Sequence, residues 1–75
     1  MLLSEMQVGD RGKISRFVGG QSGFRRHLLM LGVIPGTPFE VVRVAPMGDP
    51  VEIRVRGSMI SVRKADAAIV EVQKD

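Results

Sequence analysis

The sequence contains no cysteine, and His27 is its single histidine. Without thiols, a chain can form neither a disulfide framework nor a thiolate metal site. One histidine is too few for a nitrogen ligand set that would hold a transition metal within one chain. The four aspartates and four glutamates do not show the spacing of a calcium-binding loop. The sequence therefore predicts neither a metal site nor a cofactor.

The same shortage of chemical groups argues against catalysis. Five serines are present, but His27 is the one candidate base, and a serine nucleophile needs a base beside it. Ser22 and His27 are five residues apart, which places them about 140° apart around a helix axis. A chain of 75 residues is also short for an enclosed active-site cleft. We interpret the sequence as that of a non-enzyme with no catalytic residues.

Long apolar runs are absent as well. Residues 1–3 are followed at once by Ser4 and Glu5, so the sequence shows neither a basic start nor an apolar stretch of signal-peptide length. No segment approaches the roughly 20 apolar residues that span a bilayer. We expect a cytoplasmic protein that does not insert into the membrane directly.

Tryptophan and tyrosine are missing, and the three phenylalanines fall at core-like positions. Proteins that read single-stranded nucleic acid stack bases on aromatic side chains, and grooves for proline-rich peptides are also lined by aromatic rings. The chain is mildly basic, with 11 Lys and Arg against 8 Asp and Glu, but the basic residues are dispersed among acids. This pattern is typical of a solvated surface of mixed charge. We therefore expect no nucleic-acid partner.

Glycine and proline residues separate short apolar runs, and this pattern predicts a small β fold with one helical insertion. Residues 39–45 are almost continuously apolar and should form a central strand, whereas residues 51–56 alternate between apolar and charged. The expected strands are residues 12–18, 39–45, 51–56, 60–63 and 69–72, with short helical turns near residues 4–6 and 65–68. Five short strands favour a small closed or nearly closed barrel, because closure removes exposed edges. We predict a mainly β, SH3-like five-stranded barrel that forms one domain over residues 1–75.

The segment after residue 22 is predicted to be the inserted α-helix. Ser22 can accept a backbone N–H as the N-cap, and Gly32 suits the left-handed residue at the helix end. Val33 is expected to fold back against Leu28. Apolar residues at i, i+4 and i+7 predict one inward face, formed by Phe24, Leu28 and Leu31.

Residues 19–23 are glycine-rich and precede this helix, which suggests a phosphate-binding loop. They lack the lysine and the spacing of a nucleoside-triphosphate loop. The alternative is a simple strand-to-helix connection. Weak anion binding with Arg25 and Arg26 stays open at this stage.

The exterior therefore offers the candidate functional residues. The outward helix face combines arginine with apolar side chains, a composition enriched in protein interfaces, and consists of Arg25, Arg26, Leu29 and Met30. The loop 45–50 is stiffened by two prolines, which lowers the entropy lost on binding, and its candidate residues are Pro46, Met47, Asp49 and Pro50. The structural alternatives are that a neighbouring loop covers Leu29 and that the second segment is only a rigid hairpin connection.

Several segments together resemble the FeoA family of small cytoplasmic proteins of bacterial ferrous iron uptake. They are residues 31–36 (LGVIPG), 45–50 (APMGDP), 55–57 (VRG) and 62–67 (VRKADA). Ser58 and Met59 depart from the family pattern, in which a bulkier aromatic residue is frequent. The resemblance implies an SH3-like barrel with a helical insertion. It also implies an accessory of FeoB, the membrane ferrous iron transporter with a cytoplasmic GTP-binding domain, which the protein would bind on its cytoplasmic side to modulate transport or GTP turnover.

Two other functions stay open at this stage. Metal-dependent transcriptional repressors carry a regulatory domain with a similar SH3-like fold, and the net charge of +3 leaves a small nucleic-acid-binding module in consideration. The sequence does not decide whether the protein forms a homo-oligomer. It also leaves open weak metal or anion binding at a subunit interface.

Overall fold

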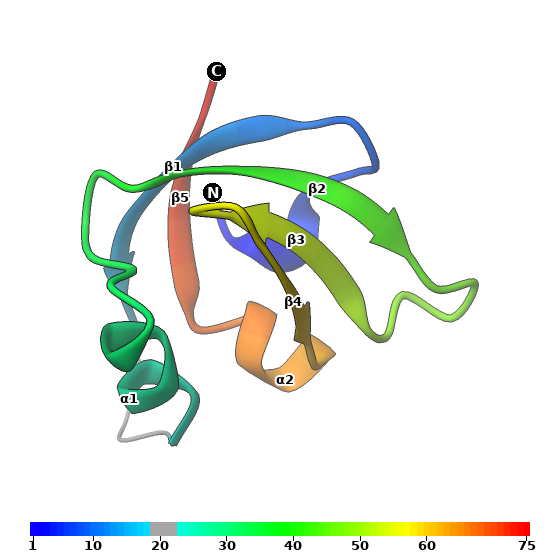
Figure 1. Cartoon of the computed structure of the whole chain (residues 1–75). Coiled ribbons are helices and arrows are strands. Elements are labelled where there is room, and N and C mark those ends of the chain that lie inside the picture. Colours follow the sequence, from blue (N-terminus) through cyan, green and yellow to red (C-terminus); the bar gives the residue numbers. More distant parts are fainter. Residues whose placement is uncertain (19–22) are drawn as a thin grey trace.

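Five antiparallel strands pair in one curved sheet in the order β4-β3-β2-β1-β5, as the computed structural model shows for residues 1–18 and 23–75 (Figure 1). The mainly β prediction is confirmed. Each predicted strand and helical turn corresponds to an observed element, within a few residues at its ends. The elements in chain order are the 3₁₀ turn η1 (Leu3–Glu5), β1 (Arg11–Phe17), α1 (Gly23–Met30), β2 (Pro38–Val44), β3 (Val51–Val55), β4 (Ser58–Val62), α2 (Lys64–Ala67) and β5 (Val70–Lys74).

Strand β2 lies at the centre of the sheet, as its apolar composition predicts. Phe39 and Val41 are buried, and Val42 and Val44 are half-buried. The register of β2 on β3 shifts between Val41 and Arg43, and the register of β1 on β5 also shifts, near Ser15. Bulges of this kind bend a strand and increase its twist. They help a short sheet to curl around its own core.

The core lies on the concave side of the sheet and draws alternate residues from the strands. In β3, Val51, Ile53 and Val55 are buried while Glu52 and Arg54 point outward, as the alternation predicts. The remaining buried apolar residues come from η1, the other strands and the helices, namely Leu3, Met6, Ile14, Leu28, Val33, Phe39, Val41, Ile60, Val62, Ala67, Val70 and Val72.

The end of α1 is fixed by two backbone hydrogen bonds. Gly32, with φ +81°, donates to the Leu29 carbonyl at 3.0 Å, and Val33 donates to the Leu28 carbonyl at 2.9 Å. This pair of bonds defines a Schellman motif, and the apolar contact that accompanies the motif joins the buried residues Leu28 and Val33. The predicted helix end at Gly32 is confirmed.

One residue of the predicted inward helix face is placed differently. Leu31 is 41% exposed, although Leu28 is buried and Phe24 is half-buried against the core. The prediction for Leu31 was wrong because the helix ends at Met30 and Val33 folds back into the space below the helix. The proposed cap Ser22 and most of the glycine-rich segment 19–23 lie outside the described residues.

The two edges of the sheet differ. The outer edge of β5 is covered in part by the N-terminal segment, because Val72 donates to the Met1 carbonyl at 2.7 Å and Leu2 forms a bridge with Glu71. Strand β4 forms the opposite edge and pairs with β3 alone in the described part of the sheet. The barrel is thus not closed by pairing of β4 with β5, which are joined by α2.

Candidate partner-binding surface

The outward face of α1 is exposed as predicted. Leu29 and Met30 are 49% and 81% exposed, so no neighbouring loop buries Leu29. Arg25 and Arg26 are also exposed. The Arg25 guanidinium lies 5.7 Å from the centre of the Phe17 ring, a cation–π contact that connects α1 to β1. This face therefore presents apolar and cationic groups together.

More large apolar side chains are exposed near α1 than the sequence predicted. Leu31 and Ile34, which are 41% and 54% exposed, follow the helix in the chain. We call the set Leu29, Met30, Leu31 and Ile34 the α1 patch. Ile34 lies between Gly32 and Pro35, and its position in a turn was the one sequence signal that it would lack a buried environment. Arg56 adds a cation beside the patch, because its Nε atom lies 3.4 Å from where a β-carbon on Gly32 would be.

The loop between β2 and β3 forms a tight, projecting turn. Gly48 donates to the Ala45 carbonyl at 2.7 Å, and Ala45 donates to the Pro50 carbonyl at 3.1 Å. Proline follows Ala45 at the position that a type I turn favours. Pro46 and Pro50 are exposed, and Met47 is 86% exposed at the tip. The loop is thus both a well-formed hairpin connection and an apolar projection.

Asp49 has a structural partner that the sequence did not indicate. Its Oδ1 atom accepts a hydrogen bond of 3.0 Å from the backbone N–H of Lys64, the first residue of α2. The N–H groups of a first helical turn have no partner within the helix, so a carboxylate there satisfies one of them. This bond joins the β2–β3 loop to α2.

Replacing Asp49 with alanine is expected to lower the free energy of unfolding by about 0.5–1.5 kcal/mol, because the Lys64 N–H loses its acceptor. Asp49→Asn retains an oxygen at the same position and should lower the free energy of unfolding by less. Urea unfolding curves of both variants measure the difference. Equal stability of Asp49→Ala and the parent protein would show that the bond contributes nothing.

The two predicted contact regions are not brought together. Figure 1 shows α1 at one side of the molecule and the β2–β3 loop at the other. One short partner segment therefore does not contact both. The structure instead places a third feature next to α1.

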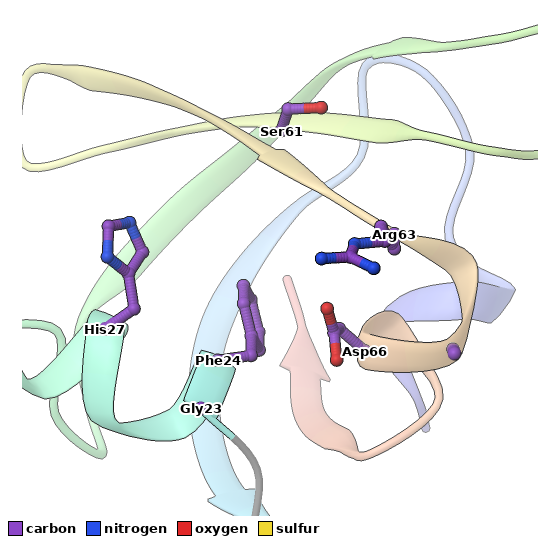
Figure 2. Close-up of a pocket in the computed structure, with 7 residues that line it drawn as sticks. Gly23, Phe24, His27, Ser61, Arg63 and Asp66 are labelled. Carbon is purple, nitrogen blue, oxygen red and sulfur yellow. The ribbon is translucent and has the colours of Figure 1, made fainter.

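A groove of about 440 Å³ lies between α1 on one side and β4 with α2 on the other. Figure 2 shows Phe24 and His27 on the α1 side, opposite Ser61, Arg63 and Asp66. His27 is exposed. The sequence did not predict the groove, because its two walls are distant along the chain and no spacing motif connects them.

The groove walls provide one imidazole, one carboxylate, one hydroxyl and one guanidinium. In residues 1–18 and 23–75, no group of three or more His, Asp and Glu side chains is arranged to hold a metal ion. None of the helices in this part of the chain has the length and apolar character that crossing a membrane requires.

Charges are distributed unevenly over the molecule. Five ion pairs lie on the sheet and at Asp10, which directly precedes β1. They are Arg11–Glu40, Arg16–Glu71, Arg43–Glu52, Arg54–Glu40 and Lys74–Asp10. The backbone N–H of Gln7 and the nearby Lys74 ammonium lower the pKa of the Asp10 carboxyl. Six Lys and Arg side chains of the described chain take part in none of these pairs. Arg25 and Arg26 belong to α1, Arg56 lies beside Gly32, Arg63 lines the groove, and Lys64 follows Arg63 at the start of α2. The sixth is Lys13, on β1.

Residues 1–74 match the FeoA domain family. The chain belongs to this family. A relative from Porphyromonas gingivalis, the "Fe(2+) transport protein A/Fe(2+) transporter FeoB fusion protein", is 41% identical over 73 residues. The alignment covers 97% of this chain and only 8% of that protein's length. The family resemblance inferred from segments 31–36, 45–50, 55–57 and 62–67 is confirmed.

Solved structures of FeoA proteins share the fold of this FeoA domain. The solution structure of FeoA from Chlorobium tepidum is 34% identical with a TM-score of 0.87, over 97% of this chain and 69% of that one. FeoA from Stenotrophomonas maltophilia, solved with zinc and described as a procaryotic SH3 domain protein, has a TM-score of 0.84 at 22% identity, over 100% and 95% of the two chains. The predicted SH3-like fold is confirmed.

Proposed function

We propose that this FeoA domain is a non-catalytic accessory of ferrous iron uptake that acts in the cytoplasm. It binds the cytoplasmic side of an FeoB-type transporter and modulates transport or GTP turnover. The observation that carries this proposal is the Porphyromonas gingivalis relative, which combines transport protein A and transporter FeoB in one polypeptide. Covalent linkage keeps two domains within reach of each other. A chain that is 41% identical to part of such a fusion is well suited to associate with a transporter of this kind.

The surface of the domain supports binding. Met30 and Leu29 are exposed on α1 beside Arg25 and Arg26, and methionine and arginine are enriched in interfaces. Methionine also adapts to irregular partner surfaces. Met47 is a second apolar projection, at the other side of the molecule. We assign the first contact to the outward face of α1, because that surface is larger and combines apolar with cationic groups.

The alternatives that the sequence left open are less well supported. A single-strand nucleic-acid binder needs exposed aromatic rings, but Phe39 is buried, and Phe17 and Phe24 are half-buried against the core. The transporter fusion favours ferrous iron transport over a repressor's regulatory domain.

The proposal is tested with the purified transporter from the same genome, as the full-length protein and as its isolated cytoplasmic domain. The 75-residue chain should be retained by at least one of them in a pull-down, and the rate of GTP hydrolysis should change when it is added. Absence of binding to both, together with unchanged iron uptake after deletion of the gene, would refute the proposal.

Arg26→Glu is expected to weaken transporter binding by about tenfold, a change of about 1.4 kcal/mol, while the fold stays intact because Arg26 is exposed and outside the ion pairs. Lys13→Glu makes the same charge change on β1 and should leave binding nearly unaltered. Isothermal titration calorimetry measures both affinities. Equal losses in the two variants would indicate a general charge effect rather than contact through α1.

A further inference from the structure

Strand β4 exposes backbone groups that no other segment of the described chain uses. A two-residue turn joins β3 to β4, and both of its residues, Arg56 and Gly57, have positive φ of 51° and 78°, as a type I′ turn requires. The pair that flanks such a turn exchanges both hydrogen bonds, and the next pair exchanges none. With Val55 opposite Ser58, the N–H and C=O groups of Met59 and Ser61 therefore point away from β3.

The free edge of β4 borders the groove. Ser61 lines the groove together with Phe24 and His27 of α1 (Figure 2). An extended peptide placed in the groove would thus have β4 on one side and α1 on the other. Such a peptide can add to a sheet edge as a further strand, with main-chain hydrogen bonds providing affinity. The opposite sheet edge is already used in part, because the Met1 carbonyl accepts a hydrogen bond from Val72 and Leu2 forms a bridge with Glu71.

The charges around the groove define the chemistry of the partner. Arg63 points into the groove from the end of β4, and Lys64 follows it at the start of α2. Neither of these two cations makes an ion pair among the described residues. Arg25 and Arg26 lie on the outward face of α1 and do not line the groove. Asp66 is the one acidic residue among those that line the groove. The groove is therefore complementary to a segment rich in Asp or Glu.

We propose that this groove binds an extended acidic segment of the protein partner, which pairs with the free edge of β4 as an additional strand. The inference rests on the proposed accessory function and adds the surface and the partner chemistry. A polypeptide is favoured over a nucleic acid because the open edge presents alternating N–H and C=O groups that another peptide backbone complements. The half-buried rings of Phe17 and Phe24 do not form a stacking platform.

A titration monitored by amide chemical shifts tests the site directly. The probe is a synthetic peptide of alternating Glu and Val, about ten residues long to match a strand, and the control is a peptide of alternating Lys and Val. The Glu-Val peptide should shift the amides of residues 59–63 and protect those of Met59 and Ser61 from hydrogen exchange. Shifts confined to other surfaces, equal binding of the Lys-Val peptide, or tighter binding of an oligo-dT strand at the same amides would overturn the proposal.

Ser61→Pro is the sharpest variant, because proline removes the outward N–H and is tolerated on edge strands where that N–H faces solvent. It should weaken binding of the Glu-Val peptide by about tenfold or more, whereas Ser61→Ala, which keeps the N–H, should bind like the parent. Unchanged affinity of a folded Ser61→Pro variant would overturn the proposal. If Ser61→Pro does not fold, Arg63→Glu replaces it, with Lys13→Glu as the matched control. Equal affinities of those two variants would equally overturn the proposal.

The transporter distinguishes this inference from the function on which it rests. If the parent chain binds the full-length transporter and the folded Ser61→Pro variant binds equally well, the groove is not the contact, although the accessory function stands. If the parent binds the Glu-Val peptide along β4 but not the transporter, the acidic-segment site stands and the proposed partner is wrong.

Discussion

Replacing Leu28 with alanine is expected to lower the free energy of unfolding by about 2–5 kcal/mol, the range observed when buried leucines are truncated. Leu28 is 1% exposed and is the buried residue of α1. Its carbonyl accepts the hydrogen bond from Val33 that ends the helix, and both side chains belong to the core. The shortened side chain would leave a cavity at the place where α1 is attached to the sheet.

Leu29→Ala is the matched control for this prediction. The two leucines are neighbours on the same helix, but Leu29 is 49% exposed, so its truncation should change stability by no more than about 0.5 kcal/mol. Urea unfolding followed by circular dichroism measures both. Because small domains are stabilised by only about 5–15 kcal/mol in total, Leu28→Ala should lower the unfolding midpoint markedly. A larger loss for Leu29→Ala would mean that α1 is rotated from the orientation described.

Gly12→Ala is expected to lower the free energy of unfolding by about 1–3 kcal/mol or more, the cost of forcing an extra group into a packed site. A β-carbon on Gly12 would overlap the backbone carbonyl oxygen of Gln73 and would lie 3.2 Å from the Cα atom of Lys74. Both atoms belong to the backbone of β5, which cannot move aside without loss of its pairing with β1. The penalty is therefore steric and does not arise from an unusual backbone angle at residue 12.

Gly23→Ala provides the comparison, because a β-carbon on Gly23 would meet no atom within 4 Å. Alanine loses less conformational freedom on folding than glycine, so this variant should be as stable as the parent or more stable by up to about 1 kcal/mol. Thermal unfolding of the two variants checks the contrast. Similar stability of Gly12→Ala and Gly23→Ala would show that β5 yields to the added methyl group without cost.

The arrangement of the elements could be predicted because local rules decide most of it. Alternation placed Val51, Ile53 and Val55 in the core, and Gly32 marked the end of α1. The steric role of Gly12 could not be predicted, since the strand that contacts it lies at the other end of the sequence. Leu31 was misplaced for a related reason, because the helical period continues to residue 31 while the helix itself ends at Met30.

The candidate surface was predicted in part. Exposure of Arg25, Arg26, Leu29 and Met30 followed from the helical period, which separates an inner from an outer face without knowledge of the fold. The groove and the free edge of β4 required the strand order, which no local pattern encodes. The hydrogen bond from the Lys64 N–H to Asp49 could not be predicted either, because it joins a loop to a helix that is 15 residues away in the sequence.

The position of the C-terminus limits how a fused domain could reach α1. The chain leaves β5 on the side of the molecule opposite α1 (Figure 1), and the longest dimension of the molecule is 27 Å. Since an extended chain advances about 3.3–3.6 Å per residue, a tether attached beyond Asp75 needs roughly eight residues to span that length. With a shorter tether, a fused domain could reach α1 only through its own bulk, and a much longer tether would lower the effective concentration of the fused domain at α1. Tether length alone would thus tune how often the two domains meet, without any change in the contact itself.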